Sequence, residues 1–145
     1  MTRAARGRRL AMLRHLEDSA TRSVEGVAGR ADDEALEARV RRIADDHERH
    51  VRELDDALEL LHRRPGSGLP EDFRESVGAR TAALDAAEGR SETLREVLVT
   101  ERFAAGQYED ALASGEVGDL DGLLARHLAD ERSHAYALEH VFGGR

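Results

Sequence analysis

The sequence predicts an all-α protein, an antiparallel four-helix bundle in which a long crossover containing a short helix joins two helical hairpins. Three observations support this prediction. Apolar residues recur at steps of three and four along most of the 145-residue chain. β-branched residues never form a run, and the two prolines, Pro65 and Pro70, stand close together. We therefore expect no sheet and a single domain spanning residues 1–145.

The first predicted hairpin contains two long helices. The first runs from about Thr2 to Gly29, and its apolar face is formed by Leu10, Leu13, Ala20, Val24 and Val27. The second runs from about Asp32 to His62, and its apolar face is formed by Leu36, Val40, Ile43, Leu54 and Leu61. The segment Arg64-Pro65-Gly66-Ser67-Gly68-Leu69-Pro70 should end this helix, because proline cannot continue it.

A crossover over about residues 64–90 should link the two hairpins. It contains a weakly amphipathic helix from Glu71 to about Ala87, after which we expect Ser91 to cap the next long helix. That helix carries Leu94, Val97, Ala104, Tyr108 and Ala111 on its apolar face. After a loop at residues 115–118, the last helix carries Leu120, Leu124, Leu138 and Val141.

The two hairpins repeat one another. Adding 84 to a residue number in the first hairpin aligns it without gaps with the second, as for Glu17 and Glu101 (101 − 17 = 84). Other matched pairs are Leu36 with Leu120, Asp46 with Asp130, His50 with His134, and Leu54 with Leu138. This pattern predicts two copies related by a pseudo-two-fold axis.

Polar residues interrupt the apolar faces at positions that helical spacing directs inward. They are Glu17, His47, His50, Glu101, Tyr108, His127, Glu131 and His134. Burying an unpaired carboxylate costs several kcal/mol, so the three glutamates need cations, protons or a metal ion. Glu131 and His134 lie one helical turn apart, which places an oxygen and a nitrogen side by side. This donor combination suits iron, manganese or zinc.

These residues resemble those of the ferritin-like di-iron carboxylate superfamily, in particular its small bacterial DUF2383-type domains. The superfamily has one Glu on each of two helices and a Glu-x-x-His on each of the other two. Glu17 and Glu101 match the single glutamates, and Glu131-Arg132-Ser133-His134 matches one pair. His47-Glu48-Arg49-His50 matches the other pair only at His50. The separation from Glu to His is 33 residues in both halves (50 − 17 and 134 − 101).

His47 departs from the superfamily pattern, which has a carboxylate at this position. The site then offers three carboxylates against the four charges of two Fe(II) ions. This shortage favours a single ion, weaker iron binding, or zinc.

The resemblance implies a site for one or two non-haem iron ions, with zinc or manganese as alternatives. Its metal residues would be Glu17, His47, His50, Glu101, Glu131 and His134. It further implies a small oxidoreductase that handles Fe(II) with oxygen or peroxide, as a ferroxidase or peroxidase does. Tyr108 is the candidate catalytic residue, either bonded to a ligand or near the oxidised metal, although plain core packing also explains it. His127 receives a supporting role, because Ile43 occupies the equivalent place in the other half.

A second class of function also accounts for the inward polar residues. In a non-catalytic interaction module, Glu17 would pair with His50 and Glu101 with His134 merely to set the helix register. We also expect a homodimer, because Leu98 and Phe103 flank the apolar face of their helix.

Composition excludes several other functions. The net charge of −8 argues against nucleic-acid binding, which needs a basic surface. The absence of cysteine excludes disulfides, thiol catalysis and cysteine-ligated metal sites. The chain has no long apolar run, so we expect a cytoplasmic protein that does not enter a membrane.

Overall fold

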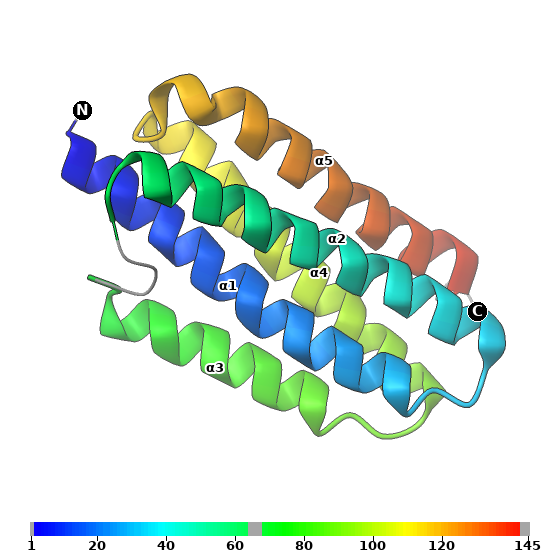
Figure 1. Cartoon of the computed structure of the whole chain (residues 1–145). Helices are drawn as coiled ribbons and strands as arrows, with labels where there is room; N and C mark the ends of the chain where they lie inside the picture. The colour runs from blue at the N-terminus through cyan, green and yellow to red at the C-terminus, as the bar shows by residue number, and fades with distance from the viewer. Residues whose placement is uncertain (1, 64–67, 143–145) are drawn as a thin grey trace.

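The computed structural model describes residues 2–63 and 68–142, with only the backbone of Val141 and Phe142. All regular elements in this part of the chain are helices, which confirms the predicted all-α class. Its elements, shown in Figure 1, are α1 (Arg3–Gly29), α2 (Glu34–Leu60), α3 (Glu71–Asp85), α4 (Arg90–Ser114), the 3₁₀-helix η1 (Gly118–Leu120), α5 (Asp121–Ala137) and the π-helix η2 (Leu138–Phe142). None of these helices combines the length and the apolar character needed to cross a membrane. The predicted break at Pro65 and the predicted core side chain of Val141 lie outside the described part.

Side-chain caps explain where the first two helices begin. The hydroxyl of Thr2 precedes α1 and accepts a hydrogen bond from the backbone N–H of Ala5 at 3.0 Å. The carboxylate of Asp33 precedes α2 and accepts from the backbone N–H groups of Ala35 and Leu36 at 2.9 and 3.2 Å. Each cap of this kind stabilises a helix by about 1 kcal/mol.

The cap predicted at Ser91 is wrong. α4 begins at Arg90, so Ser91 lies inside its first turn and is exposed. Gly89 takes the capping position with φ 80°, a left-handed backbone conformation that favours glycine. The carboxylate of Glu92 accepts from the backbone N–H of Glu88 at 2.9 Å. This glycine and glutamate start the helix without a hydroxyl cap, which is why Ser91 is not needed there.

Apolar side chains form two large core clusters, one toward each end of the long helices, and a smaller third cluster under α3. The first includes Leu10, Leu13, Leu54, Leu58, Tyr108, Ala111, Leu124 and Leu128. The second includes Val24, Val27, Leu36, Val40, Ile43, Leu84, Leu94, Val97 and Leu138. The predicted apolar faces are confirmed for the described side chains, except that Leu61 and Leu120 are only partly buried.

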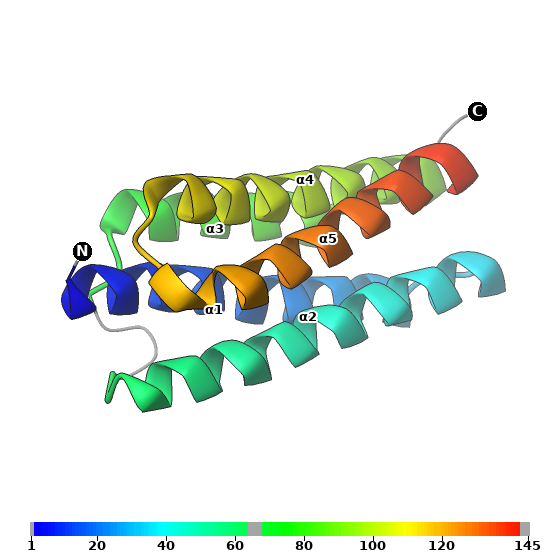
Figure 2. The same ribbon diagram turned by 90° about the horizontal axis from the view of Figure 1, so that it is seen from above.

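α3 covers the seam between α1 and α4. Phe73 and Val77 of α3 are buried against Leu16 of α1 and Ala104 of α4. α2 and α5 lie side by side on the opposite side of the molecule, as both views show (Figures 1 and 2). One seam between the two hairpins is therefore closed by apolar side chains of α3, and the other lies between α2 and α5.

The residues used to predict a homodimer have partners within the chain. Phe103 is partly buried and packs against the cluster under α3. Leu98 is partly buried and packs against the second core cluster. Both side chains are therefore partly used inside the chain, and the homodimer stays a prediction.

Replacing Leu84 with alanine should destabilise the protein strongly, because this α3 side chain is 0% exposed where it enters the second core cluster. Loss of a buried leucine costs about 2–5 kcal/mol. Leu60 of α2 is 77% exposed, so its replacement with alanine should cost less than about 0.5 kcal/mol. Urea unfolding followed by circular dichroism measures both. Equal, small effects would mean that α3 does not contribute to the folded core.

Candidate metal centre

Six polar side chains meet between the two apolar core clusters. They are Glu17 of α1, His47 and His50 of α2, Glu101 of α4, and Glu131 and His134 of α5. Five are 0% exposed, and His134 is 6% exposed. The structure thus brings together all six residues that the sequence selected as metal residues, because helical steps of three and four keep each on an inward face.

The six side chains form two overlapping sets that could each hold a metal ion. The first set is Glu17, His47, His50 and Glu131, and the second is His47, Glu101, Glu131 and His134. Within each set, one ligand atom from each residue lies within 4.8 Å of all the others. His47 and Glu131 belong to both sets, so they lie at the junction between them.

His47 lies between two carboxylates and donates to both. Its Nδ1–H donates to Oε1 of Glu17 at 2.5 Å, and its Nε2–H donates to Oε2 of Glu101 at 2.7 Å. A ring that donates from both nitrogens is a positively charged imidazolium. Burial by itself lowers the pKa of His47, but the surrounding carboxylates outweigh it and raise that pKa well above its ordinary value. Without a metal, His47 is therefore the central cation of the cluster.

The two histidine–glutamate pairs expected from the sequence are both present. Nδ1–H of His50 donates to Oε2 of Glu17 at 3.0 Å. Nδ1–H of His134 donates to Oε1 of Glu101 at 2.7 Å. Burial alone would lower the pKa of each imidazole, but the carboxylates raise it to about 10 in both. Conversely, the charge on the neighbouring histidines outweighs burial and holds the pKa of Glu101 at about 2 and that of Glu17 well below its ordinary value.

Two aspartates outside the cluster fix the rings of His50 and His134. Asp130 accepts from Nε2–H of His50 at 2.8 Å, and Asp46 accepts from Nε2–H of His134 at 2.6 Å. Both bonds join α2 to α5. Because each Nε2 is held by an aspartate, Nδ1 is the nitrogen that faces the cluster. Carboxylates that hold the outer nitrogen of a metal-binding histidine in this way orient the ring and raise its basicity.

Glu131 is the cluster residue without a hydrogen-bond partner. Both of its carboxylate oxygens are buried, and neither accepts a hydrogen bond from the described residues. The nearest imidazole nitrogen, Nδ1 of His50, lies 3.1 Å from Oε1 but directs its proton to Glu17. Burial, reinforced by the charges of Glu17 and Glu101 against the opposing charge of His47, raises the pKa of Glu131 to about 8. A raised pKa means that burial favours the protonated form, and a divalent ion at this position would replace that proton and stabilise the carboxylate.

A chain of polar contacts links the cluster to the surface through Tyr108. The hydroxyl of Tyr108 donates to Oε2 of Glu17 at 2.6 Å and lies 3.0 Å from Nδ1 of His127. Nε2 of His127 lies 2.9 Å from Oε1 of Glu53, whose side chain is 37% exposed. The His127 ring also stacks on His50, with ring centroids 3.9 Å apart. Tyr108 therefore contacts a candidate metal residue, and His127 stands outside both ligand sets. The supporting role of His127 stays a prediction.

An outer layer of charged residues, which helical spacing did not assign to the site, surrounds the cluster between α2 and α5. Arg49 donates to Asp130 at 2.7 Å and to Asp46 and Glu53 at 3.3 Å each. Each of these carboxylates contacts a different buried imidazole. The sequence did contain a pattern that marks the two aspartates, because Asp46 and Asp130 occupy matching positions in the two hairpins (130 − 46 = 84). They lie one residue, or roughly 100°, away from the inward ligands, so spacing alone assigned them to no site.

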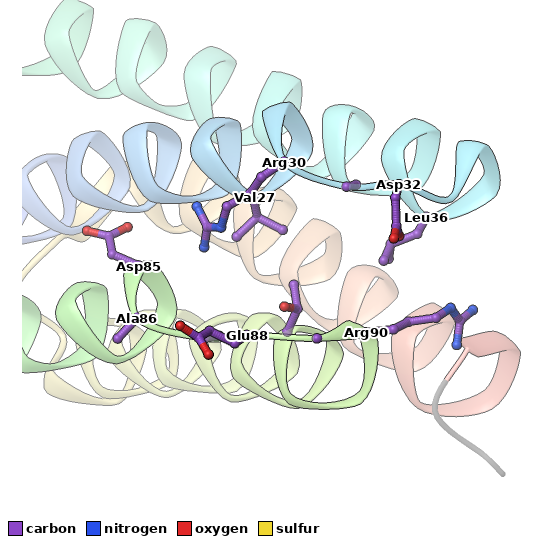
Figure 3. A pocket seen from close by; sticks show the side chains of 12 residues that line it. Val27, Arg30, Asp32, Leu36, Asp85, Ala86, Glu88 and Arg90 are labelled. Atoms are coloured by element: carbon purple, nitrogen blue, oxygen red, sulfur yellow. The ribbon is translucent and has the colours of Figure 1, made fainter.

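A cavity of about 500 Å³ lies elsewhere, where the α1–α2 and α3–α4 connections meet (Figure 3). It shares no residue with the cluster. Val27, which lines the cavity, lies roughly 15 Å along α1 from Glu17 of the cluster. Its arginines already have partners. Arg30 donates to a backbone carbonyl of α3 at 3.0 Å, and Arg90 donates to Asp33 at 3.1 Å. We therefore assign the chemistry to the cluster, where ligand atoms converge.

No protein-family model matches this chain, and no curated protein or solved structure matches it either. The geometry of the cluster is therefore what points to a function. Its buried glutamates and histidines could hold a metal ion.

In the presence of a chelator, the protein should be more stable at about pH 6 than at about pH 9 or pH 3. The pKa values of His50 and His134 are higher in the folded protein than in the unfolded chain, where a histidine has a pKa of about 6.5. These two residues therefore stabilise the folded state fully below about pH 6.5, and this stabilisation is lost as the pH rises toward about 10. The raised pKa of Glu131 also makes the folded protein less stable as the pH rises to about 8, because the buried carboxyl then loses its proton. The pKa values of Glu17 and Glu101 are lower in the folded protein than the value of about 4.3 for an unfolded chain, so the stabilisation that these carboxylates give is lost as the pH falls below about 4.3.

Thermal unfolding across this pH range measures the effect. A His15→Gln variant is the control, since His15 lies outside both ligand sets and should leave the alkaline loss unchanged. A flat profile between about pH 6 and pH 9 would show that the cluster imidazoles are not charged in the folded protein.

Proposed function

We propose that this chain is a metal-binding protein of ferritin-like architecture, an antiparallel four-helix bundle that holds a non-haem metal centre between two hairpins. The observation that carries the proposal is Glu131, a buried carboxylate without a hydrogen-bond partner at the junction of two ligand sets. The extensive packing of α1 on α2 and of α4 on α5, with α3 in the connection, supports the bundle.

The donor atoms favour iron, with zinc and manganese as alternatives. The cluster offers three imidazoles and three carboxylates, and this mixture of nitrogen and oxygen suits those metals. The chain has no cysteine, so no thiolate competes for the ion. The aspartates on His50 and His134 supply the outer hydrogen bonds that metal-binding histidines ordinarily have.

With iron bound, we propose that the protein acts as a small oxidoreductase. Held by the two ligand sets, two Fe(II) ions would supply the two electrons that, with two protons, reduce hydrogen peroxide to two water molecules. The protein keeps bulk water out, since the six cluster residues are buried. Tyr108 holds Glu17 in place through its hydroxyl, and Glu53 ends the polar chain at the surface.

A purely structural role is the second candidate function, because the cluster pairs most of its own charges. His47 joins Glu17 to Glu101, while His50 and His134 each pair with one of these glutamates. Such pairing would set the helix register without an ion. It leaves unexplained why Glu131, which lies 3.1 Å from Nδ1 of His50, accepts no hydrogen bond from the described residues.

Elemental analysis after anaerobic Fe(II) loading and desalting tests the metal proposal. The wild type should retain one or two iron ions per chain. A double variant, Glu131→Ala with His134→Ala, should retain none, because it removes ligands from both sets. The matched control is Glu25→Ala with His140→Ala, which changes one exposed glutamate and one exposed histidine and should retain the wild-type content.

Thermal unfolding supplies a second readout of the same proposal. At a metal concentration 100 times Kd, binding to the folded state adds about 2.7 kcal/mol to stability. If the folded wild type retains no metal and shows no such gain, the structural role stands instead.

Tyr108→Phe should lower the rate of Fe(II) oxidation while leaving the iron content unchanged. The substitution removes the 2.6 Å hydrogen bond that positions Glu17. A hydrogen bond to a charged group contributes about 1.5–3 kcal/mol, which corresponds to a rate loss of about tenfold or more. Stopped-flow absorbance of the ferric product measures the rate.

The matched control is Tyr136→Phe, since the Tyr136 side chain is 66% exposed. It should oxidise iron at the wild-type rate. An unchanged rate in Tyr108→Phe would reduce Tyr108 to a core-packing residue.

A further inference from the structure

His47 differs from the other two cluster histidines in the direction of its ring nitrogens. Nε2 of His50 and Nε2 of His134 are each held by an aspartate outside the cluster. Both nitrogens of His47 instead face cluster carboxylates, Nδ1 toward Glu17 and Nε2 toward Glu101. Among the three cluster imidazoles, only His47 can present one nitrogen to each ligand set.

The remaining ligands divide evenly between the two sides of the His47 ring. The Nδ1 side holds Glu17 and His50, and the Nε2 side holds Glu101 and His134. Glu131 reaches both sides, with Oε1 3.1 Å from Nδ1 of His50 and Oε2 3.9 Å from Nδ1 of His134. Each side therefore offers an ion two nitrogen and two oxygen ligands.

Charge balance explains how a histidine can occupy this central position. Two divalent ions bring four positive charges, and the three cluster glutamates supply three negative charges. An imbalance in a buried site costs several kcal/mol. A histidine that has lost both ring protons is an imidazolate with one negative charge, which completes the balance. Metal coordination drives such deprotonation, because a bound cation strongly favours the anionic form of its ligand.

We propose that His47 bridges two divalent metal ions as an imidazolate, with Nδ1 on one ion and Nε2 on the other. The inference rests on the proposed metal-binding function and adds a stoichiometry of two ions per chain. Glu131 completes both ligand sets through its two oxygens.

The exchange of protons for metal leaves the cluster neutral. In the metal-free state with all three glutamates ionised, three imidazolium rings balance three carboxylates. When two divalent ions bind, His50 and His134 each release the proton on Nδ1, and His47 releases two protons. Four protons thus pass to the solvent for four positive charges of metal.

The bridge also restricts the class of ion. An imidazolate needs a divalent ion that accepts nitrogen together with carboxylate oxygen, as iron, zinc, cobalt and copper ions do. Calcium and magnesium prefer sites made of oxygen alone, so they should not fill this one.

Cobalt(II) is the probe that we would use to test the bridge. Elemental analysis of the loaded wild type should find two cobalt ions per chain. Proton NMR of this paramagnetic protein, compared in H₂O and D₂O, should show two solvent-exchangeable, strongly shifted imidazole signals. These come from the Nε2–H groups of His50 and His134, which the aspartates retain. His47 should contribute none, whereas a His47 bound to one ion would contribute a third.

Two substitutions of His47 separate bridging from packing. His47→Gln removes both nitrogens and should weaken binding of the second ion by more than the roughly 100-fold that loss of an outer hydrogen-bond partner produces. His47→Glu restores a fourth carboxylate and should again bind two ions. His15→Gln is the control and should match the wild type, and circular dichroism checks the folding of each variant.

The outcomes distinguish this inference from the function on which it rests. One cobalt ion per wild-type chain, or three exchangeable imidazole signals, would overturn the bridge and leave metal binding intact. Unchanged affinity for two ions in a folded His47→Gln variant would also overturn it. A wild type that binds no cobalt, zinc or iron would overturn the metal-binding function itself.

Discussion

Three carboxylates buried in the middle of a helical core impose the constraint on which the rest of this structure depends. Glu17, Glu101 and Glu131 come from three different helices and are 0% exposed. Each would cost several kcal/mol if it were left unpaired. His50 and His134 each pair with a glutamate of their own hairpin, whereas His47 of the first hairpin donates to Glu101 of the second, so this contact requires both hairpins to be in register. The two large apolar clusters consequently lie on either side of this polar layer.

The two sides of the molecule protect this polar layer by different means. On one side, Phe73 and Val77 of α3 close the seam between α1 and α4 with apolar contacts. On the other side, between α2 and α5, the contacts are polar and centre on Arg49. One partly exposed guanidinium there joins three carboxylates, and each of these contacts a different buried imidazole. The surface of this seam and the orientation of the inner rings are therefore linked.

The three cluster glutamates differ in how they affect the stability of the metal-free protein. Glu17 and Glu101 are well paired with histidines, so they cost little without a metal. Glu131 accepts no hydrogen bond from the described residues, and ordinary selection for stability would replace it with an apolar side chain. A buried residue that destabilises the metal-free protein indicates a role in the metal-bound protein. His47 reconciles the two states in our proposal, since it is a cation without metal and an anionic bridge with it.

The sequence by itself determined the helical class, most of the core and the six residues that meet in the cluster, because steps of three and four assign each side chain to a face whatever its partners. The equal spacing of 33 residues placed Glu17 with His50 and Glu101 with His134. Only the tertiary structure decided which ring nitrogen faces which carboxylate, and that α3 covers Phe103. It alone also gave Asp46, Asp130 and Arg49 their roles. These side chains lie off the inward faces, and their contacts exist only because α2 and α5 approach each other from distant parts of the chain, a proximity that local periodicity does not encode.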